Sequence, residues 1–161
     1  MSYDYPMFKA LWGIGKEEGA GAMAVRRAVF VEERGMDCER EFDLMDEFAA
    51  HLFVSDEAGV PIAAGRMYPE AGRVMLDRIA VMPDFRSLPY DDLVLRVMLY
   101  KAQQTELIDI AAAVEPGAEK LYIPFGFRIA GETLLRGEKT ALYTVPRQNV
   151  IWDSACKHEK Q

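Results

Sequence analysis

Three strand-like segments joined by short turns occupy residues 50–82, and they constrain the fold more than any other part of the sequence. They are Ala50–Asp56, Val60–Tyr68 and Arg73–Met82. The first turn, Glu57-Ala58-Gly59, places a glycine where a positive φ is tolerated, and a second turn spans Pro69–Gly72. Because turns this short join neighbouring strands, the sequence predicts an antiparallel meander.

Apolar spacing predicts helices on both sides of this meander. From Ala22 to Arg34 the apolar residues can share one face, and Gly35 is placed to end the helix. A longer helix is expected from Asp91 to Leu107, with carboxylates in its first turn. The other expected elements are strands at 7–14, 108–114, 127–135 and 138–145, and a short helix at 116–124. A helix between the meander and strand 108–114 predicts a parallel neighbour, reached by a right-handed crossover.

The composition is that of a soluble globular chain. The 161 residues are 50% hydrophobic and 28% charged, so we expect one domain over residues 1–161 with a sizeable core. Residues 146–161 give no clear assignment. The net charge of -7 repels phosphate backbones, so nucleic acid is not an expected partner.

Several other classes of protein are not expected. The first ten residues lack a basic start followed by an apolar run, and no stretch approaches the ~18 apolar residues of a membrane span. Cys38 and Cys156 match no close-spaced metal pattern and are expected to be free thiols, so no metal is expected. We therefore expect a cytoplasmic protein without a membrane partner.

Four segments, in this order, resemble the GNAT superfamily of acyl-CoA-dependent N-acyltransferases. They are RRAVFVEE (26–33), FDLMDEFAAHLFV (42–54), LDRIAVMPDFR (76–86) and AEKLYIPFGFRIAGE (118–132). The last two are the more specific, and the resemblance covers about residues 26–143. It implies an α/β (α+β) fold with a mixed central sheet of six to seven strands and flanking helices. The fourth and fifth strands of such a sheet splay apart.

The resemblance also implies acetyl-CoA as the co-substrate. Backbone groups of Ile79, Ala80 and Val81 would then hold the pantetheine arm and polarise the thioester carbonyl. Their apolar side chains are equally typical of an ordinary sheet strand. Arg86, with nearby backbone amides, would meet the phosphates.

Two residues are candidates for proton transfer. Tyr122 matches the family's general acid: a phenol with a pKa near ~10 keeps its proton at neutral pH and can give it to the leaving thiolate. The alternative is a helix-face aromatic. His51 is a candidate base for the amine substrate, and the alternative is that it binds a backbone carbonyl at the start of its strand.

The acceptor is expected to be a small-molecule amine or an N-terminal amine. Glu33, Asp43 and Asp46 could line its binding mouth, since carboxylates attract a cationic amine. A solvated acidic loop explains them equally well. Arg78, placed among apolar neighbours, is expected to form an ion pair with one of the loop acids. Strand edges or the C-terminal segment could form a homodimer contact.

The expected phosphate-binding loop departs from the family pattern Arg/Gln-x-x-Gly-x-Gly/Ala. Here it reads Arg86-Ser87-Leu88-Pro89-Tyr90-Asp91. Pro89 has no N–H to donate, and carboxylates at Asp91 and Asp92 occupy the place of two phosphates. In one interpretation the loop shifts, and the amides of Ser87, Leu88 and Tyr90 bind the phosphates.

Other interpretations of this departure remain open. The ligand could lack a pyrophosphate or bind differently. The chain could also be a non-catalytic binding or regulatory protein on a GNAT scaffold. A further alternative is a relative of lactone synthases, which RRAVFVEERG also resembles, because one fold hosts several chemistries.

Overall fold

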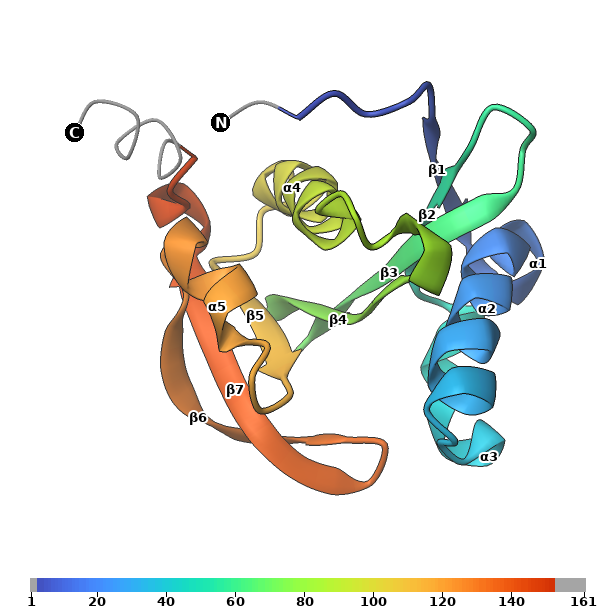
Figure 1. Ribbon diagram of the computed structural model, residues 1–161. Coiled ribbons are helices and arrows are strands. Elements are labelled where there is room, and N and C mark those ends of the chain that lie inside the picture. Colours follow the sequence, from blue (N-terminus) through green and yellow to red (C-terminus); the bar gives the residue numbers. More distant parts are fainter. Residues whose placement is uncertain (1–2, 153–161) are drawn as a thin grey trace.

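The computed structural model describes residues 3–152, and the predicted thiol of Cys156 lies outside this range. Seven strands form one mixed sheet in the order β1-β2-β3-β4-β5-β7-β6 (Figure 1). Neighbouring strands are antiparallel except β4 and β5, which are parallel. The strands are β1 (Lys9–Ile14), β2 (Ala50–Ser55), β3 (Pro61–Glu70), β4 (Arg73–Val81), β5 (Asp109–Val114), β6 (Arg128–Leu135) and β7 (Glu138–Pro146). The predicted meander and the parallel connection after it are confirmed.

The three predicted helices are present with different boundaries, and several short helical segments between the strands were not predicted. The helical segments are α1 (Gly15–Glu18), α2 (Ala20–Arg26), the π-helical η1 (Arg27–Glu33), α3 (Cys38–Glu41), η2 (Leu44–Glu47), η3 (Pro83–Phe85), α4 (Tyr90–Gln103), α5 (Glu119–Tyr122), η4 (Ile123–Phe125) and η5 (Arg147–Asn149). The helix predicted to reach Leu107 ends at Gln103. Just beyond this end, the Thr105 hydroxyl donates to the Ala102 carbonyl at 2.8 Å, a local bond that competes with continuing the helix.

Helices cover both faces of the sheet. On one face α4 buries Val94, Leu95, Met98 and Leu99. On the other, α2 and η1 bury Ala22, Val25, Val29 and Phe30. Since successive side chains of a strand point to opposite faces, the neighbours Ala63 and Ala64 of β3 belong to different cores. Most residues of the central strands are therefore apolar and buried on both faces, and the buried charged exceptions are Arg66 of β3 and Asp77 and Arg78 of β4.

A β-bulge in β4 separates this strand from β5. Ala64 of β3 pairs with Ala80 and Arg66 pairs with Asp77, so β4 carries one extra residue between these pairs. The bulge contains Arg78 with a φ of 55°, in the left-handed region. Pairing of β4 with β5 covers only residues 74–76 and 110–112, whereas β5 continues along β7 to Val114. The predicted splaying of the fourth and fifth strands is confirmed.

Opposite the bulge, a glycine allows α4 to lie close to the sheet. A Cβ atom at Gly65 would lie 2.3 Å from the sulfur of Met98 and 2.9 Å from a methyl group of Val94. Any larger residue would push α4 away from β3. The start of α4, which forms one side of the site described next, is therefore fixed partly by this glycine.

Candidate active site

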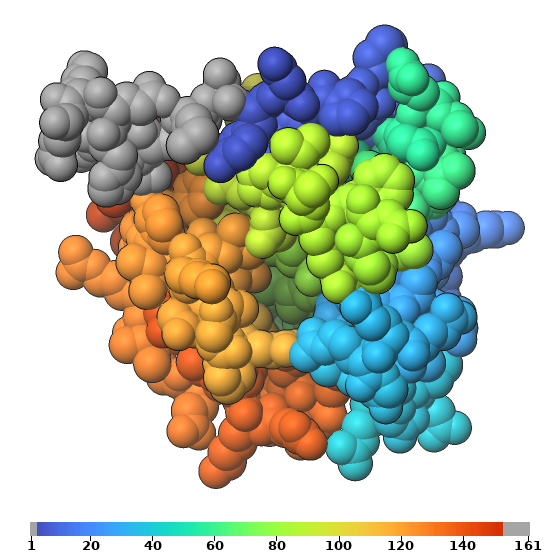
Figure 2. All heavy atoms as spheres, viewed as in Figure 1, coloured from blue at the N-terminus to red at the C-terminus, as the bar shows by residue number. Residues whose placement is uncertain are grey.

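A cleft opens where β4 leaves β5. Its larger part, about 690 Å³, lies between η1, the end of β4 and the loop at 86–91. A narrower part of about 190 Å³ continues between β4 and β5 towards α5. The two parts share Phe30, Arg34, Ile79 and Asp91. Figure 2 shows the hollow bordered by α4, the α5 region and the α2–η1 helix, with atoms of the central strands at its floor.

The β4 wall contains the three residues predicted to hold pantetheine. Ile79, Ala80 and Val81 all line the larger part of the cleft. Ala80 and Val81 pair with β3. Within the described residues, the opposite edge of β4 has no strand partner beyond Leu76. An unpaired strand edge can bind an extended chain through its amides and carbonyls, so this wall fits an extended amide-containing arm.

Tyr122 lies on the opposite wall, at the end of α5. Its side chain lines the narrow part of the cleft together with Ile79. The ring packs edge-on against Phe127, with 5.4 Å between centroids, and only 4% of the residue is exposed. Gly126, at a φ of 98°, turns the chain between the two aromatic residues. Burial raises the pKa of Tyr122 well above that of a free phenol, so the hydroxyl stays protonated at neutral pH.

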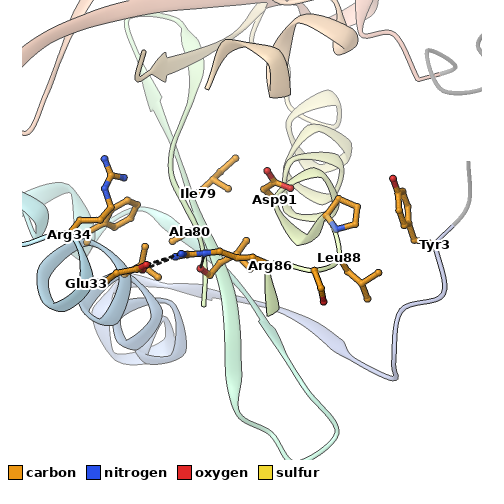
Figure 3. A pocket seen from close by; sticks show the side chains of 13 residues that line it. Tyr3, Glu33, Arg34, Ile79, Ala80, Arg86, Leu88 and Asp91 are labelled. Atoms are coloured by element: carbon orange, nitrogen blue, oxygen red, sulfur yellow. Dashed lines mark hydrogen bonds and ion pairs between the residues drawn. The ribbon is translucent and has the colours of Figure 1, made fainter. Parts of the chain in front are cut away.

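The guanidinium of Arg86 is held by hydrogen bonds to other residues of the chain. Its two terminal nitrogens donate to the Glu33 carboxylate, each at 2.7 Å, and its Nε donates to the Val81 carbonyl at 3.0 Å (Figure 3). The hydrogen bond from Arg86 lowers the pKa of Glu33. The predicted phosphate-binding arginine and a predicted substrate-binding carboxylate therefore neutralise one another across the larger part of the cleft.

The loop before α4 offers few donors to an anion. Ser87 and Leu88 line the cleft, but the amide of Tyr90 already donates to the Leu88 carbonyl at 2.8 Å. Tyr90 is also 3% exposed, so its predicted role in binding phosphate is not supported. Asp91 lines both parts of the cleft, as Ile79 does (Figure 3). The residues thus fit the arm of a coenzyme better than they fit a pyrophosphate.

Two predicted acceptor-binding acids belong to one ionic cluster, in which Asp46 is buried and the side chain of Asp43 is 40% exposed. Asp46 is 0% exposed and accepts hydrogen bonds from Arg26 at 2.7 Å and from Arg66 at 2.9 Å. Asp43 accepts from Arg66 at 2.6 Å and lies 3.5 Å from Arg78. Asp46 cannot touch a substrate from this position, so that expectation is not met. The predicted pairing of Arg78 with a loop acid is confirmed, and Arg78 also donates to Asp77 at 2.8 Å.

His51 is buried beneath this cluster. The residue is 0% exposed, and its Nε2 lies 2.9 Å from the carbonyl oxygen of Asp46. Since a carbonyl can only accept, Nε2 carries the hydrogen of a neutral ring. Burial lowers the pKa of His51, which keeps the ring neutral at pH 7. This geometry favours the carbonyl-binding interpretation over that of a base.

Sequence reasoning missed the ion pairs that cross the cleft. Arg34, after η1, donates to Glu115 at the end of β5 at 2.6 Å. Arg136, in the β6–β7 turn, donates to Glu41 at 2.6 Å and to Glu115 at 2.9 Å. Arg136 has a φ of 53°, and two-residue hairpin turns usually place asparagine or glycine there. The unusual arginine at this turn position is the one sequence feature that could have indicated an ion pair of Arg136.

Within residues 3–152, no cluster of at least three histidine, cysteine, aspartate or glutamate side chains could hold a metal ion. None of the helices in this range has both the length and the apolar character needed to cross a bilayer.

The sheet order, the bulged β4 and its separation from β5 define the GNAT fold, and solved structures share it. An N-acetyltransferase candidate from Lactobacillus plantarum is 25% identical, with a TM-score of 0.76 over 86% of this chain and 97% of that chain. An acyl-CoA N-acyltransferase from Pseudomonas aeruginosa is 17% identical, with a TM-score of 0.74 over 86% and 99% of the two chains. FeeM, an N-acyl amino acid synthase from uncultured soil microbes, is 15% identical, with a TM-score of 0.72 over 89% and 92%.

Two further comparisons, made with the sequence, found no match. No protein-family model matches the chain, and no curated protein matches it either. The GNAT fold therefore rests on the architecture and on the solved structures, which place the chain among proteins with an acyltransferase fold.

Proposed function

We propose that this chain is an acyl-CoA-dependent N-acyltransferase that moves an acetyl group onto an amine. The observation that carries the proposal is the gap between β4 and β5, where Ile79 and Tyr122 line the same narrow cleft. The unpaired edge of β4 offers backbone groups to an extended donor. Acyltransferase neighbours with the same fold support this reaction class.

The transfer needs one proton at a defined atom. The amine nitrogen forms a bond to the acyl carbon, the carbon–sulfur bond breaks, and the nitrogen loses a proton to solvent. Tyr122 holds its proton on Oη because burial raises its pKa, and it gives that proton to the sulfur as the thiolate leaves. The phenolate then regains a proton from solvent, which balances the proton that the nitrogen released.

A second function is favoured by a separate observation. The Arg86–Glu33 pair, the missing amide at Pro89 and the Asp91 carboxylate all oppose binding of a pyrophosphate. A non-catalytic binding or regulatory protein on this scaffold would have no need of such a loop. This candidate predicts that coenzyme A derivatives do not bind.

Calorimetry with two ligands tests both functions. Acetyl-CoA and S-acetyl-pantetheine share the thioester arm, and only the first carries the nucleotide phosphates. We expect binding of both, with a much smaller advantage for acetyl-CoA than a normal phosphate loop would give. If neither ligand gives heat or a thermal shift at millimolar concentration, the acyltransferase proposal fails and the non-catalytic candidate stands.

A further inference from the structure

A second cleft, of about 340 Å³, lies between the segment after η1, α3 and the β6–β7 hairpin. Its charged lining includes four cations and three carboxylates: Arg34, Arg40, Arg136, Lys139, Asp37, Glu115 and Glu138. The whole chain has a net charge of -7, so a predominance of cations in one cleft runs against the general charge of the molecule.

This second cleft adjoins the cleft between β4 and β5, which is called the donor cleft here because it is proposed to hold the acyl donor. The contact is with the narrow part of the donor cleft. The second cleft and this narrow part are both lined by Arg34, Glu115, Leu135 and Arg136. Glu115 stands at their boundary, on the end of β5, and the narrow cleft on its other side contains Tyr122. A small molecule in the second cleft would therefore place one end near the position where the thioester is expected.

Two of the three carboxylates that line the second cleft have partners within the chain, whereas the exposed side chain of Glu138 has none among the described residues. Glu115 accepts from Arg34 at 2.6 Å and from Arg136 at 2.9 Å. Asp37 accepts the amide of Glu39 at 2.9 Å. Arg40 and Lys139, in contrast, form no ion pair with any described residue. The cleft thus has cationic groups available for an anion.

The acids that were expected to attract a cationic amine are neutralised elsewhere. Glu33 is paired with Arg86, Asp43 with Arg66, and Asp46 is buried with Arg26. Each of these carboxylates already has an arginine partner, although the side chains of Glu33 and Asp43 remain 36% and 40% exposed. Beside the donor cleft, the second cleft offers two exposed cations without an ion pair among the described residues, Arg40 and Lys139, next to the exposed carboxylate of Glu138.

We propose that the second cleft binds the acceptor, and that this acceptor is an amine carrying a carboxylate, of the α-amino acid class. Arg40 and Lys139 bind the carboxylate, and Glu115 accepts a hydrogen bond from the amine and directs it towards the donor cleft. This proposal rests on the proposed acyltransferase function and names its substrate class.

Matched substrate pairs test the proposal. L-Leucine is compared with 3-methylbutylamine and L-phenylalanine with 2-phenylethylamine, and the other proteinogenic amino acids are screened in the same way. Release of free thiol from acetyl-CoA is followed, and thermal shift with each compound gives a binding readout that needs no turnover. We expect kcat/KM for the preferred amino acid to exceed that of its decarboxylated partner by about tenfold, as one charge-assisted contact implies.

Charge-neutral variants locate the effect. Arg40→Gln and Lys139→Gln should each lower kcat/KM for the amino acid by about three- to tenfold and leave that of the plain amine unchanged. Lys120→Gln, an exposed change in α5 outside the second cleft, is the matched control. Equal or better use of the plain amines overturns the proposal, as does the absence of any shift or turnover across the amino acids. If acetyl-CoA binds in that last case, the acyltransferase function survives; if it does not, both fall.

Discussion

The carboxylate of Glu41 and the guanidinium of Arg136 join the two sides of the cleft, with 2.6 Å between Oε1 and Nε. Glu41 is completely buried, and its other oxygen accepts from Arg26 of α2 at 2.7 Å. Arg136 belongs to the β6–β7 hairpin, on the β5 side of the gap. Because β4 and β5 share no ladder beyond Leu76, such ion pairs help to set how far the two sides stand apart.

Neutralising Glu41 should therefore destabilise the chain. Glu41→Gln leaves the buried Arg26 and Arg78 and the mostly buried Arg136 short of a counter-charge, and we expect a loss of about 3 kcal/mol in the free energy of unfolding. Urea denaturation measures this loss. Glu39→Gln, an exposed change in the same helix α3, should cost less than about 0.5 kcal/mol. Similar losses for the two variants would show that the buried pair does not hold the cleft together.

Removing the Tyr122 hydroxyl should slow the chemical step more than it weakens coenzyme binding. We expect Tyr122→Phe to lower kcat by about a hundredfold while the Kd for acetyl-CoA stays within about twofold. Because burial raises the pKa of Tyr122, turnover should show no loss from ionisation of this phenol below about pH 10. Tyr100→Phe, on the exposed face of α4, is the control. A change in Kd without a change in kcat would assign Tyr122 to packing.

The order of elements could be predicted because the signals are local. Three strand-like segments joined by short turns at 50–82 predict the meander. The apolar run at 108–114 predicts a buried strand. Placing Ile79 and Tyr122 in the site needed the GNAT resemblance, since neither residue differs from a core residue by its own chemistry.

The ion pairs could not be predicted in the same way. Arg136 and Glu41 are 95 residues apart in the sequence, and Arg66 and Asp43 are 23 apart. Which arginine neutralises which carboxylate depends on the bulge at Arg78 and on the hairpin turn, and both are tertiary features. Acids that suggest an open substrate mouth in the sequence are for this reason paired with arginines in the folded chain.

Releasing Arg86 from Glu33 should strengthen coenzyme binding. In Glu33→Gln the guanidinium loses its ionic partner and can turn to a phosphate, so we expect the Kd for acetyl-CoA to fall about three- to tenfold. Calorimetry at two salt concentrations measures this, because an added phosphate contact increases the salt dependence. Glu32→Gln, exposed and beside Glu33, is the matched control. Weaker binding by Glu33→Gln would mean that the pair shapes the donor site and does not obstruct it.

Asp91 should repel the phosphates directly. Its carboxylate lines both parts of the donor cleft, and a like charge at short range costs on the order of 1 kcal/mol. We expect Asp91→Asn to lower the Kd for acetyl-CoA about fivefold and to leave that for S-acetyl-pantetheine unchanged. Asp84→Asn, exposed in η3 and outside the cleft lining, controls for net charge. An equal gain for the two ligands would show that Asp91 acts on the arm and not on the phosphates.

The buried acid Asp46 should make the fold sensitive to low pH. Burial alone would raise the pKa of Asp46, but the hydrogen bond and charge of Arg26, together with Arg66, lower it to about 2. An unfolded aspartate has a pKa near ~3.9. The ionised carboxylate therefore stabilises the folded chain above about pH 4, and this contribution is lost as the pH falls towards 2.

Asp46→Asn tests this dependence, because the amide keeps the shape of the side chain and cannot ionise. At pH 7 we expect a loss of about 3 kcal/mol in the free energy of unfolding, and the gap to the wild-type chain should narrow between about pH 4 and pH 2. Glu47→Gln is the neighbouring control. Its ion pair with Lys16 is half exposed, at 3.3 Å, and should contribute less than about 1 kcal/mol. A gap that stays constant down to pH 2 would mean that Asp46 stabilises the fold through its hydrogen bonds and shape, and not through its charge.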